Sequence, residues 1–361
     1  MPATDGPNVS DDLPRPPGDF VERLRGLHRD LQAHLWARLS ERARADGNGQ
    51  AEDDHALATA VGHEGGDTIF ALDRVADEVL VPGFEAWATD WGVSFALVAE
   101  GWPEGRAMVP RGANPAAARF VVIADPVDGT RGLMYGKRSA WSLAAVAPVT
   151  APGWWGRGEA PARLADIRAA VQTELPTHRA YLADQVWAVR GAGTAGVTRD
   201  LLTGTEAPLR FRPAANATLE HGFASLFKGL PWAKADIAAL EDRLLRELAG
   251  PAMEPPPIYD DQYISTGGQL FALMTGQDRF IADLRPQFAA ASGHLPCHPY
   301  DICAALVAAA AGVVLTDGSG GSLDAPLDTE TPIAWIGYAN ATLRAAIEPV
   351  LLRLLRERER G

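Results

Sequence analysis

Cysteine is scarce in this 361-residue chain, and long apolar runs are missing. The two cysteines, Cys297 and Cys303, are too few for a disulfide scaffold and fit a reducing cytoplasm, which is the expected location. The chain has no apolar run of roughly 18 residues, so we expect no transmembrane helix. Residues 1–19 lack the apolar stretch of a signal peptide and are expected to form a disordered tail.

Positive charge is also in the minority. The chain has 33 Lys and Arg residues against 46 Asp and Glu residues, which gives a net charge of −13. Such a chain repels nucleic-acid backbones and anionic membranes, so neither is expected as a partner. It would equally repel a phosphate substrate, and a phosphatase of this composition therefore needs cations in its site. Apolar residues make up 47% of the chain, which is ample for a large core.

Helical periodicity and short apolar runs are mixed along the whole chain. The leucine spacing over Phe20–Asp46 predicts a helix, while Ser94–Ala99 and Phe120–Ala124 predict buried strands. Further helices are predicted over Asp67–Pro82, Lys234–Leu248, Asp301–Ala311 and Ala341–Arg358. This mixture indicates an α/β (α+β) fold.

The strongest chemical signal is the run FVVIADPVDGT, which ends at Thr130. Pro126 restricts the residue before it to an extended conformation, so Asp125 and Asp128 are presented at the end of a buried strand. Gly129 lets the backbone bend close to a ligand. If Thr130 opens a helix, the backbone N–H groups there point at an anion. Two carboxylates beside backbone donors suit Mg²⁺ and a phosphate group.

Other interpretations remain open for several of these residues. Taken alone, the DPVDGT run is equally consistent with a strand–turn–helix corner in which Asp serves as a cap. Arg131, Lys137 and Arg138 either contact a substrate phosphate or lie on a solvated face. A zinc site is a further alternative, although its candidate ligands lack the paired spacing of structural zinc sites. These zinc candidates are His294, Cys297, His298 and Cys303.

The DPVDGT run resembles the DPxDGT signature of the inositol monophosphatase superfamily, which also includes fructose-1,6-bisphosphatases and 3′-phosphoadenosine-5′-phosphate phosphatases. Further landmarks follow the family's order. Asp67 and Asp73 have the spacing of an upstream pair of aspartates, and Glu100 follows the short run SFALVA, where the family usually has two glutamates. Asp301 follows Tyr300, which replaces the usual Trp, and precedes an apolar helix and a Gly-Gly turn.

The resemblance implies a layered αβαβα sandwich with the site between two halves. Residues 20–150 would form an N-terminal α+β half with the metal site, and residues 151–361 a C-terminal α/β half that completes it. Two or three Mg²⁺ ions are implied. Their implied ligands are Asp73, Glu100, Asp125, the Val127 carbonyl, Asp128 and Asp301.

The implied reaction is hydrolysis of a small phosphorylated metabolite by a water that the metal activates. Asp73, Thr130 and Glu100 are the implied catalytic residues, with Asp73 and Thr130 relaying the proton of the water. The implied substrate contacts are Gly129, Thr130, Ser265 and Asp283. An additional stretch of about eleven residues before Asp301, near 285–295, could reshape the pocket.

Which ester is cut stays open. An inositol monophosphate-like substrate is the first expectation, and fructose 1,6-bisphosphate or 3′-phosphoadenosine-5′-phosphate is the alternative within the same superfamily. A relative that binds metal or phosphate without catalysis is the alternative from another class. A homodimer is also expected.

Overall fold

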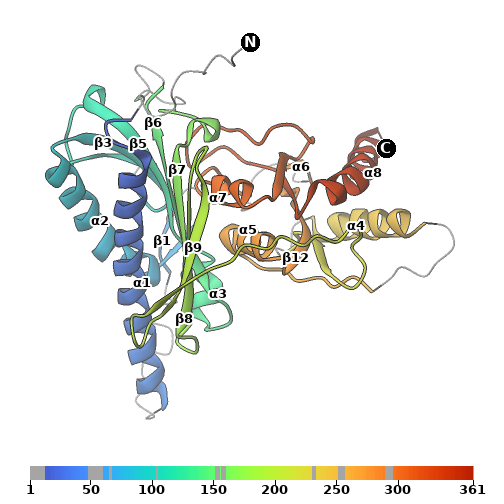
Figure 1. Ribbon diagram of the computed structural model, residues 1–361, viewed down its shortest axis with the longest axis horizontal. Helices are drawn as coiled ribbons and strands as arrows, with labels where there is room; N and C mark the ends of the chain where they lie inside the picture. The colour runs from blue at the N-terminus through green and yellow to red at the C-terminus, as the bar shows by residue number, and fades with distance from the viewer. Residues whose placement is uncertain are drawn as a thin grey trace.

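The computed structural model describes residues 13–47, 60–64, 67–102, 105–150, 155, 160–229, 233–250, 257–288 and 296–360. Its described helices and strands build two β-sheets with helices on and between them (Figure 1).

The larger sheet has eight strands and runs in the order β10-β9-β8-β7-β6-β5-β3-β4. The β3 and β5 strands are parallel, whereas the other neighbours in this sheet pair antiparallel. In chain order the strands are β3 Ser94–Ala99, β4 Arg106–Val109, β5 Ala118–Asp128, β6 Ala140–Pro148, β7 Ala169–Leu175, β8 Leu182–Val189, β9 Gly193–Asp200 and β10 Glu206–Pro208. A small hairpin pairs β1 (Ala60–Glu64) with β2 (Asp67–Phe70).

The smaller sheet has the order β11-β12-β14-β13, and its β11 and β12 strands are parallel. Its strands are β11 Phe223–Leu226, β12 Asp278–Asp283, β13 Val314–Asp317 and β14 Trp335–Tyr338. The helices α5 (Thr266–Thr275) and α7 (Ala305–Ala310) contact both sheets. These two helices therefore form the middle layer of the molecule.

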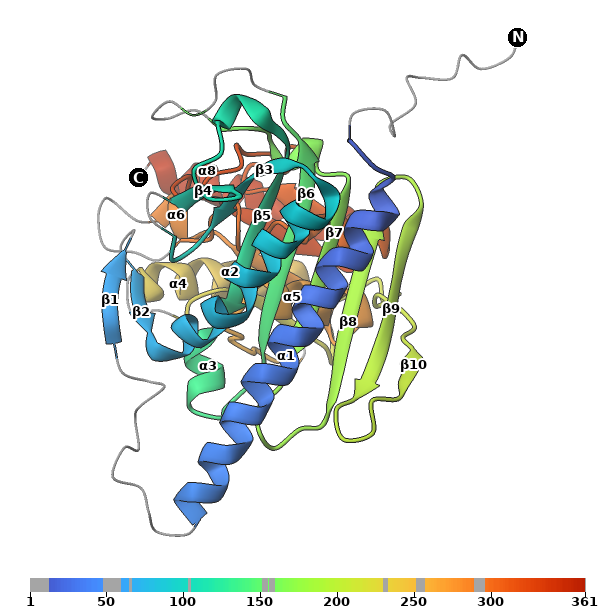
Figure 2. The same ribbon diagram turned by 90° about the vertical axis from the view of Figure 1, so that its left-hand side faces the viewer.

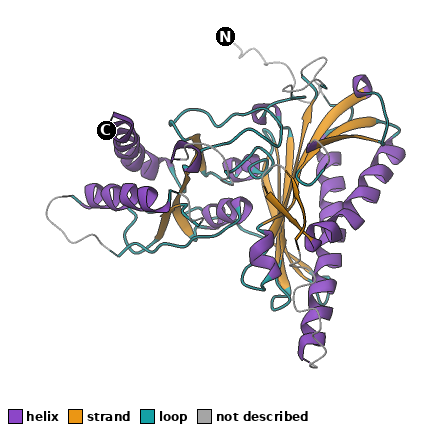
Figure 3. Ribbon diagram, turned by 180° about the vertical axis from the view of Figure 1, so that it is seen from behind, coloured by secondary structure: helices purple, strands orange, loops and turns teal. Residues whose placement is uncertain are grey.

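Two outer helical layers close the fold. On one side, α1 (Pro17–Gly47) and α2 (Ala71–Trp91) lie across the free face of the larger sheet (Figure 2). On the other side, α4 (Lys234–Ala249) and α8 (Ala341–Arg360) pack together over the smaller sheet (Figure 3). The expected α/β sandwich with αβαβα layers is confirmed. The remaining helices are α3 Thr130–Met134, α6 Arg285–Phe288, and short 3-10 turns at Pro115–Ala117 and Leu164–Asp166.

The two apolar runs that were predicted to be strands form β3 and β5, which are neighbours inside the larger sheet and strongly buried. The β3 and β5 strands carry fully buried apolar side chains on both faces, because helices cover both faces of this sheet. Two apolar clusters result, one under α1 and α2 and one between the sheets. The site described below lies at the end of β5.

Several sequence-based expectations need correction. The helix expected over Asp67–Pro82 is a strand as far as Phe70, and α2 begins only at Ala71 and continues through Pro82 to Trp91. The helix expected from Asp301 begins at Ala305, because residues 301–304 form turns. The larger sheet continues past residue 150 to β10, and the division of the chain into two halves stays a prediction.

The expected N-terminal tail is only partly covered by the structure. Residues 1–12 lie outside the described part, but Leu13 is buried and α1 already begins at Pro17. None of the helices in the described ranges is both long and apolar enough to cross a membrane.

Candidate active site

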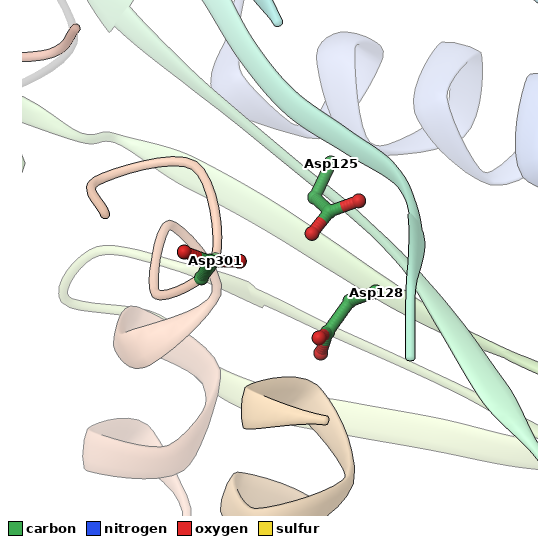
Figure 4. Close-up of side chains that lie close together, drawn as sticks. All are labelled: Asp125, Asp128 and Asp301. Carbon is green, nitrogen blue, oxygen red and sulfur yellow. The ribbon is translucent and has the colours of Figure 1, made fainter. Parts of the chain in front are cut away.

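Three carboxylates from distant parts of the chain meet between the two sheets. Asp125 and Asp128 come from the end of β5, and Asp301 comes from the turn that leads into α7 (Figure 4). One carboxylate oxygen from each lies within 4.8 Å of the others. Among the described residues, this is the group of acidic, His or Cys side chains with the geometry to hold a metal ion.

The end of β5 presents its two aspartates at an irregularity of the sheet. Asp125 pairs with Leu143 on β6 and Asp128 pairs with Trp141, so three steps along β5 match two along β6. Such a bulge bends the strand and redirects its side chains. The Asp125 carboxylate accepts a hydrogen bond of 3.0 Å from the Val127 N–H, which fixes its orientation. Asp125 is only 1% exposed.

The N-terminus of α5 holds the carboxylate of Asp128. The Gly267 N–H and the Ser265 hydroxyl donate to its Oδ2 at 2.6 and 2.8 Å, and the Thr266 N–H donates to its Oδ1 at 3.2 Å. Ser265 is also the N-cap of α5, since its Oγ accepts from the Gly268 N–H. The positive end of the helix dipole further favours a negative charge at this position.

Glycines allow this close approach of β5 and α5. Gly129 has φ +96°, and a Cβ there would lie 3.0 Å from both the Ile264 carbonyl and the Ser265 Cβ. At Gly267 a Cβ would lie 2.7 Å from Leu143 and 3.1 Å from the Asp128 carboxylate. A side chain at either position would push the helix N-terminus away from the carboxylate.

Asp301 is held by its own turn. Its Oδ2 accepts a hydrogen bond of 2.6 Å from the His298 N–H, and its N–H donates to the His298 carbonyl at 3.1 Å. Because α7 begins at Ala305, Asp301 does not serve as the N-cap of that helix. Its side chain is 18% exposed, so it is the most accessible of the three carboxylates.

Burial and mutual repulsion act strongly on these acids. Burial, followed by the charges of Glu100, Asp128 and Asp301, raises the pKa of Asp125 well above its ordinary value. Burial and, as the second cause, the charge of Asp128 raise the pKa of Asp301 well above its ordinary value. Burial raises the pKa of Asp128 to about 6, while its hydrogen bonds from α5 lower it in part. The protein alone therefore leaves the ionised cluster short of positive charge.

Two of the other residues expected at the metal and catalytic positions, Glu100 and Thr130, lie beside this cluster. Glu100 follows β3 directly and is close enough to raise the pKa of Asp125 by its charge. Thr130 opens α3, and its hydroxyl donates to the Val127 carbonyl at 2.8 Å. Asp73 lies in the first turn of α2, and its side chain is outside the described part of the structure.

The expected substrate residues Ser265 and Asp283 have protein partners in this structure. The Ser265 hydroxyl donates to Asp128, as described above. Asp283 ends β12, is 1% exposed, and binds Arg285 through both carboxylate oxygens at 2.8 and 2.5 Å. The Arg285 guanidinium lies 4.5 Å from the centre of the Phe227 ring. The contacts of Ser265 and Asp283 with substrate stay predictions.

Sequence reasoning missed Arg285, which lies beside the cluster. Its charge lowers the pKa of Asp128 and of Asp301, although burial raises both overall. A signal was present, since Asp283 and Arg285 stand two residues apart after an apolar run. The role of α5 in holding Asp128 was also missed, and the Ser-Thr-Gly-Gly start of that helix could have suggested an N-terminus that contacts a carboxylate.

The chemistry of the cysteines favours neither zinc binding nor thiol catalysis. Cys297 and Cys303 are fully buried, and burial with nearby carboxylates raises the pKa of both thiols well above the ordinary value. A buried thiol that keeps its proton is a poor nucleophile and a poor metal ligand. No zinc-like group that includes these cysteines or His298 occurs within the described ranges, and His294 lies outside them.

The carboxylate set fits a hard divalent cation. All three clustered groups offer oxygen, which Mg²⁺, Mn²⁺ and Ca²⁺ prefer, whereas soft metals prefer thiolate. A bound cation would also relieve the repulsion that raises the pKa values of Asp125, Asp128 and Asp301. The residues therefore suit divalent metal binding on the grounds of donor type, proximity and charge.

Comparison with solved structures gives the same fold. The chain superimposes on a fructose-1,6-bisphosphatase from Leishmania major in its holo form with a TM-score of 0.62 and 15% identity, covering 95% of this chain and 96% of that one. The T-state of that enzyme gives a TM-score of 0.58 at 14% identity, with 96% and 95% covered. No family model matches the sequence, and no curated protein matches it. At this identity, the likeness shows that the chain has the fold of fructose-1,6-bisphosphatase.

Proposed function

We propose that this chain is a Mg²⁺-dependent phosphatase that hydrolyses a small phosphorylated metabolite. The observation that carries the proposal is the meeting of Asp125, Asp128 and Asp301 within 4.8 Å on this fold. Two carboxylates from the end of β5 and a third from a distant part of the chain are costly to bury together, and a shared cation explains best why they meet. The fold of a sugar bisphosphatase supports the same reading.

In this proposal the chain's own residues hold and orient the reacting groups. Asp125, Asp128 and Asp301, with Glu100 beside Asp125, would hold two or three Mg²⁺ ions, and Asp73 and the Val127 carbonyl would complete the ligand set. The bound ions would supply positive charge for the phosphate and lower the pKa of a water.

In the proposal, proton transfer comes from the N-terminal part of the site, and substrate contacts come from both parts. Thr130 and Asp73 would take the proton of the attacking water. The Gly129 and Thr130 backbone would face the phosphate at the start of α3. Asp283 and Ser265 would lie towards the leaving group, where the Arg285 pair fixes the Asp283 carboxylate.

The class of substrate is proposed from the fold. A phosphorylated sugar is favoured because the neighbouring solved structures are fructose-1,6-bisphosphatases, and an inositol monophosphate is the alternative. A homodimer remains part of the proposal.

The test is phosphate release from a panel of fructose 1,6-bisphosphate, inositol 1-phosphate and 3′-phosphoadenosine-5′-phosphate. We expect turnover with Mg²⁺, loss of turnover in EDTA and recovery when Mg²⁺ is restored. Asp128→Asn and Asp301→Asn should each lower kcat on the order of 10²-fold or more, because each removes charge from a preorganised site. Asp236→Asn, on the exposed first turn of α4, is the matched control and should keep full activity.

Three results would contradict the proposal. Full activity in EDTA after exhaustive dialysis would exclude metal dependence. Near-native turnover in both site variants would show that these aspartates only shape the turns. Absence of turnover on every ester, together with tight Mg²⁺ binding, would instead favour the non-catalytic alternative.

A further inference from the structure

A cavity of about 580 Å³ lies at the joint between the two sheets, and none of the three clustered carboxylates lines it. Its position follows from β12: Asp278 begins this strand and lines the cavity, whereas Asp283 ends it beside the cluster. Five steps along the strand, at about 3.3 Å each, separate these two residues by roughly 17 Å. The volume falls within the range of about 300–1,000 Å³ that is usual for small-molecule sites.

Segments next to both sheets contribute to the wall of this cavity. The segment between α3 and β6 supplies cationic side chains, and the region from β11 to β12 supplies acidic and aromatic ones. The residues that the argument uses are Lys137, Arg138, Phe223, Asp261, Tyr263 and Asp278.

Part of the wall is held rigidly by internal contacts. Arg138 donates to the Asp261 carboxylate at 2.5 Å, and its guanidinium lies 4.7 Å from the centre of the Tyr263 ring. The Tyr263 hydroxyl donates to the Ser139 carbonyl at 2.8 Å and accepts from Trp141 at 3.0 Å. A wall fixed in this way keeps its shape without a ligand, which lowers the cost of binding one.

Two charged groups in the same cavity make no hydrogen bond or ion pair within the described part of the chain, although the charge of Arg138 lowers the pKa of Asp278 in part. Asp278 is only partly exposed, yet within the described part of the chain its carboxylate has no hydrogen-bond donor. Burial, and then the charge of Asp261, raise its pKa to about 6. Lys137 is exposed, and no ion pair to it occurs among the described residues. A carboxylate in this setting gains from hydrogen-bond donors, and an ammonium group gains from an anion.

We propose that this cavity is a second ligand site, for a small phosphorylated sugar. Lys137 and the outer edge of the Arg138 guanidinium bind the phosphate group. Asp278 accepts hydrogen bonds from the sugar hydroxyls. Phe223, which is 42% exposed, packs against the apolar face of the sugar ring. A ligand with one anionic end and several hydroxyl donors satisfies both unpartnered charges at once, which neither a simple anion nor a neutral sugar does.

Calorimetric titration of the full chain in EDTA, with glucose 6-phosphate as the probe, tests this site. Without metal the carboxylate cluster repels phosphate, so binding there is suppressed and the result does not depend on the proposed catalysis. We expect saturable binding that weakens about tenfold or more in Lys137→Ala and in Asp278→Asn, in line with the loss of a hydrogen bond to a charged group. Glucose and inorganic phosphate should each bind at least about tenfold more weakly than the ester.

Matched controls are available on α4. Lys234→Ala and Asp236→Asn remove the same charges from exposed positions outside the cavity and should leave the affinity unchanged. Asp278→Asn preserves the shape of the side chain, and Lys137 is exposed, so both variants should fold, which circular dichroism checks. The proposal is overturned by an absence of binding up to concentrations on the order of 10 mM, by affinity that neither cavity variant changes, or by equal affinity for inorganic phosphate or glucose.

Discussion

The buried charge of Asp128 makes a prediction about stability that can be worked out from the structure. Its pKa is raised from 3.8 to about 6 by burial, so the folded protein binds a proton here more tightly than the unfolded chain does. Between these two pKa values the folded state holds more protons, and its stability falls as pH rises. The metal-free protein should therefore lose stability at this residue as Asp128 ionises.

Asp128→Asn removes this ionisation and also removes the Asp128 charge that raises the pKa of Asp125 and Asp301, so the difference from the wild type reports the ionisation of Asp128 within the cluster. Relative to the wild type in EDTA, the variant should gain stability from pH 4.5 to pH 7.5. The gain accumulates up to the pKa of about 6, over about 1.5 pH units, and amounts to about 2 kcal/mol. An amide donates where the carboxylate accepts, so one hydrogen bond from α5 is lost, but that loss is the same at both pH values and cancels.

The comparison with a variant is necessary because other groups also titrate. Burial lowers the pKa of His28 to about 3, so this residue adds stability as pH rises and opposes Asp128. Burial raises the pKa of Glu174 to about 7, which acts in the same direction as Asp128. Both contributions occur in wild type and variant alike and disappear from the difference.

Urea unfolding at the two pH values, with and without Mg²⁺, measures the effect. In EDTA, the free energy of unfolding of the variant should rise relative to that of the wild type between pH 4.5 and pH 7.5. Saturating Mg²⁺ should instead raise the free energy of unfolding of the wild type more, because the wild type keeps the complete ligand set. Asp236→Asn should show neither change. A difference between wild type and Asp128→Asn that is the same at both pH values in EDTA would refute the reasoning, since Asp128 would then titrate alike in both states.

Two further substitutions test the junction of β5 with α5. Gly129→Ala should destabilise the protein by about 2 kcal/mol or more in urea unfolding, because φ is +96° and the new Cβ would lie 3.0 Å from the Ile264 carbonyl. Gly112→Ala is the control for the backbone contribution, since Gly112 has φ +80° and a Cβ there would have nothing within 4 Å. This control should lower the free energy of unfolding by less. Ser265→Ala should cost about 1 kcal/mol through the lost N-cap and weaken Mg²⁺ activation through Asp128, while equal Mg²⁺ activation in both proteins would show that the Ser265 hydroxyl does not position that carboxylate.

The local part of the site was accessible from the sequence because its geometry is encoded over a few residues. A buried apolar run, a proline and a glycine within FVVIADPVDGT predict a strand that presents two carboxylates at its end, and β5 does this with Asp125 and Asp128. The αβαβα layering followed from the resemblance, and most of the strongly periodic helices have nearly the predicted bounds.

The errors arose where local composition and tertiary packing disagree. The run after Asp301 is rich in alanine and apolar residues and reads as one continuous helix, but its first residues form turns that place the carboxylate towards β5. Asp67 carries a helix-like pattern yet pairs with β1, since a hairpin partner outweighs weak propensity. The residues next to Asp301 do not show that it meets β5, and the residues next to Asp67 do not show that it pairs with β1.

The sequence by itself determined the carboxylate inventory, the acidic balance that calls for a cation, and the strand end that displays Asp125 and Asp128. Only the tertiary structure decided that Asp301 meets them, that the N-terminus of α5 holds Asp128, and that Arg285 binds Asp283 beside the cluster. The physical reason is the range of the interactions. Backbone preferences act over a few neighbouring residues. Charge repulsion, hydrogen bonding and burial act between groups that are distant in sequence, and only the packing of the two sheets around α5 and α7 brings these groups together.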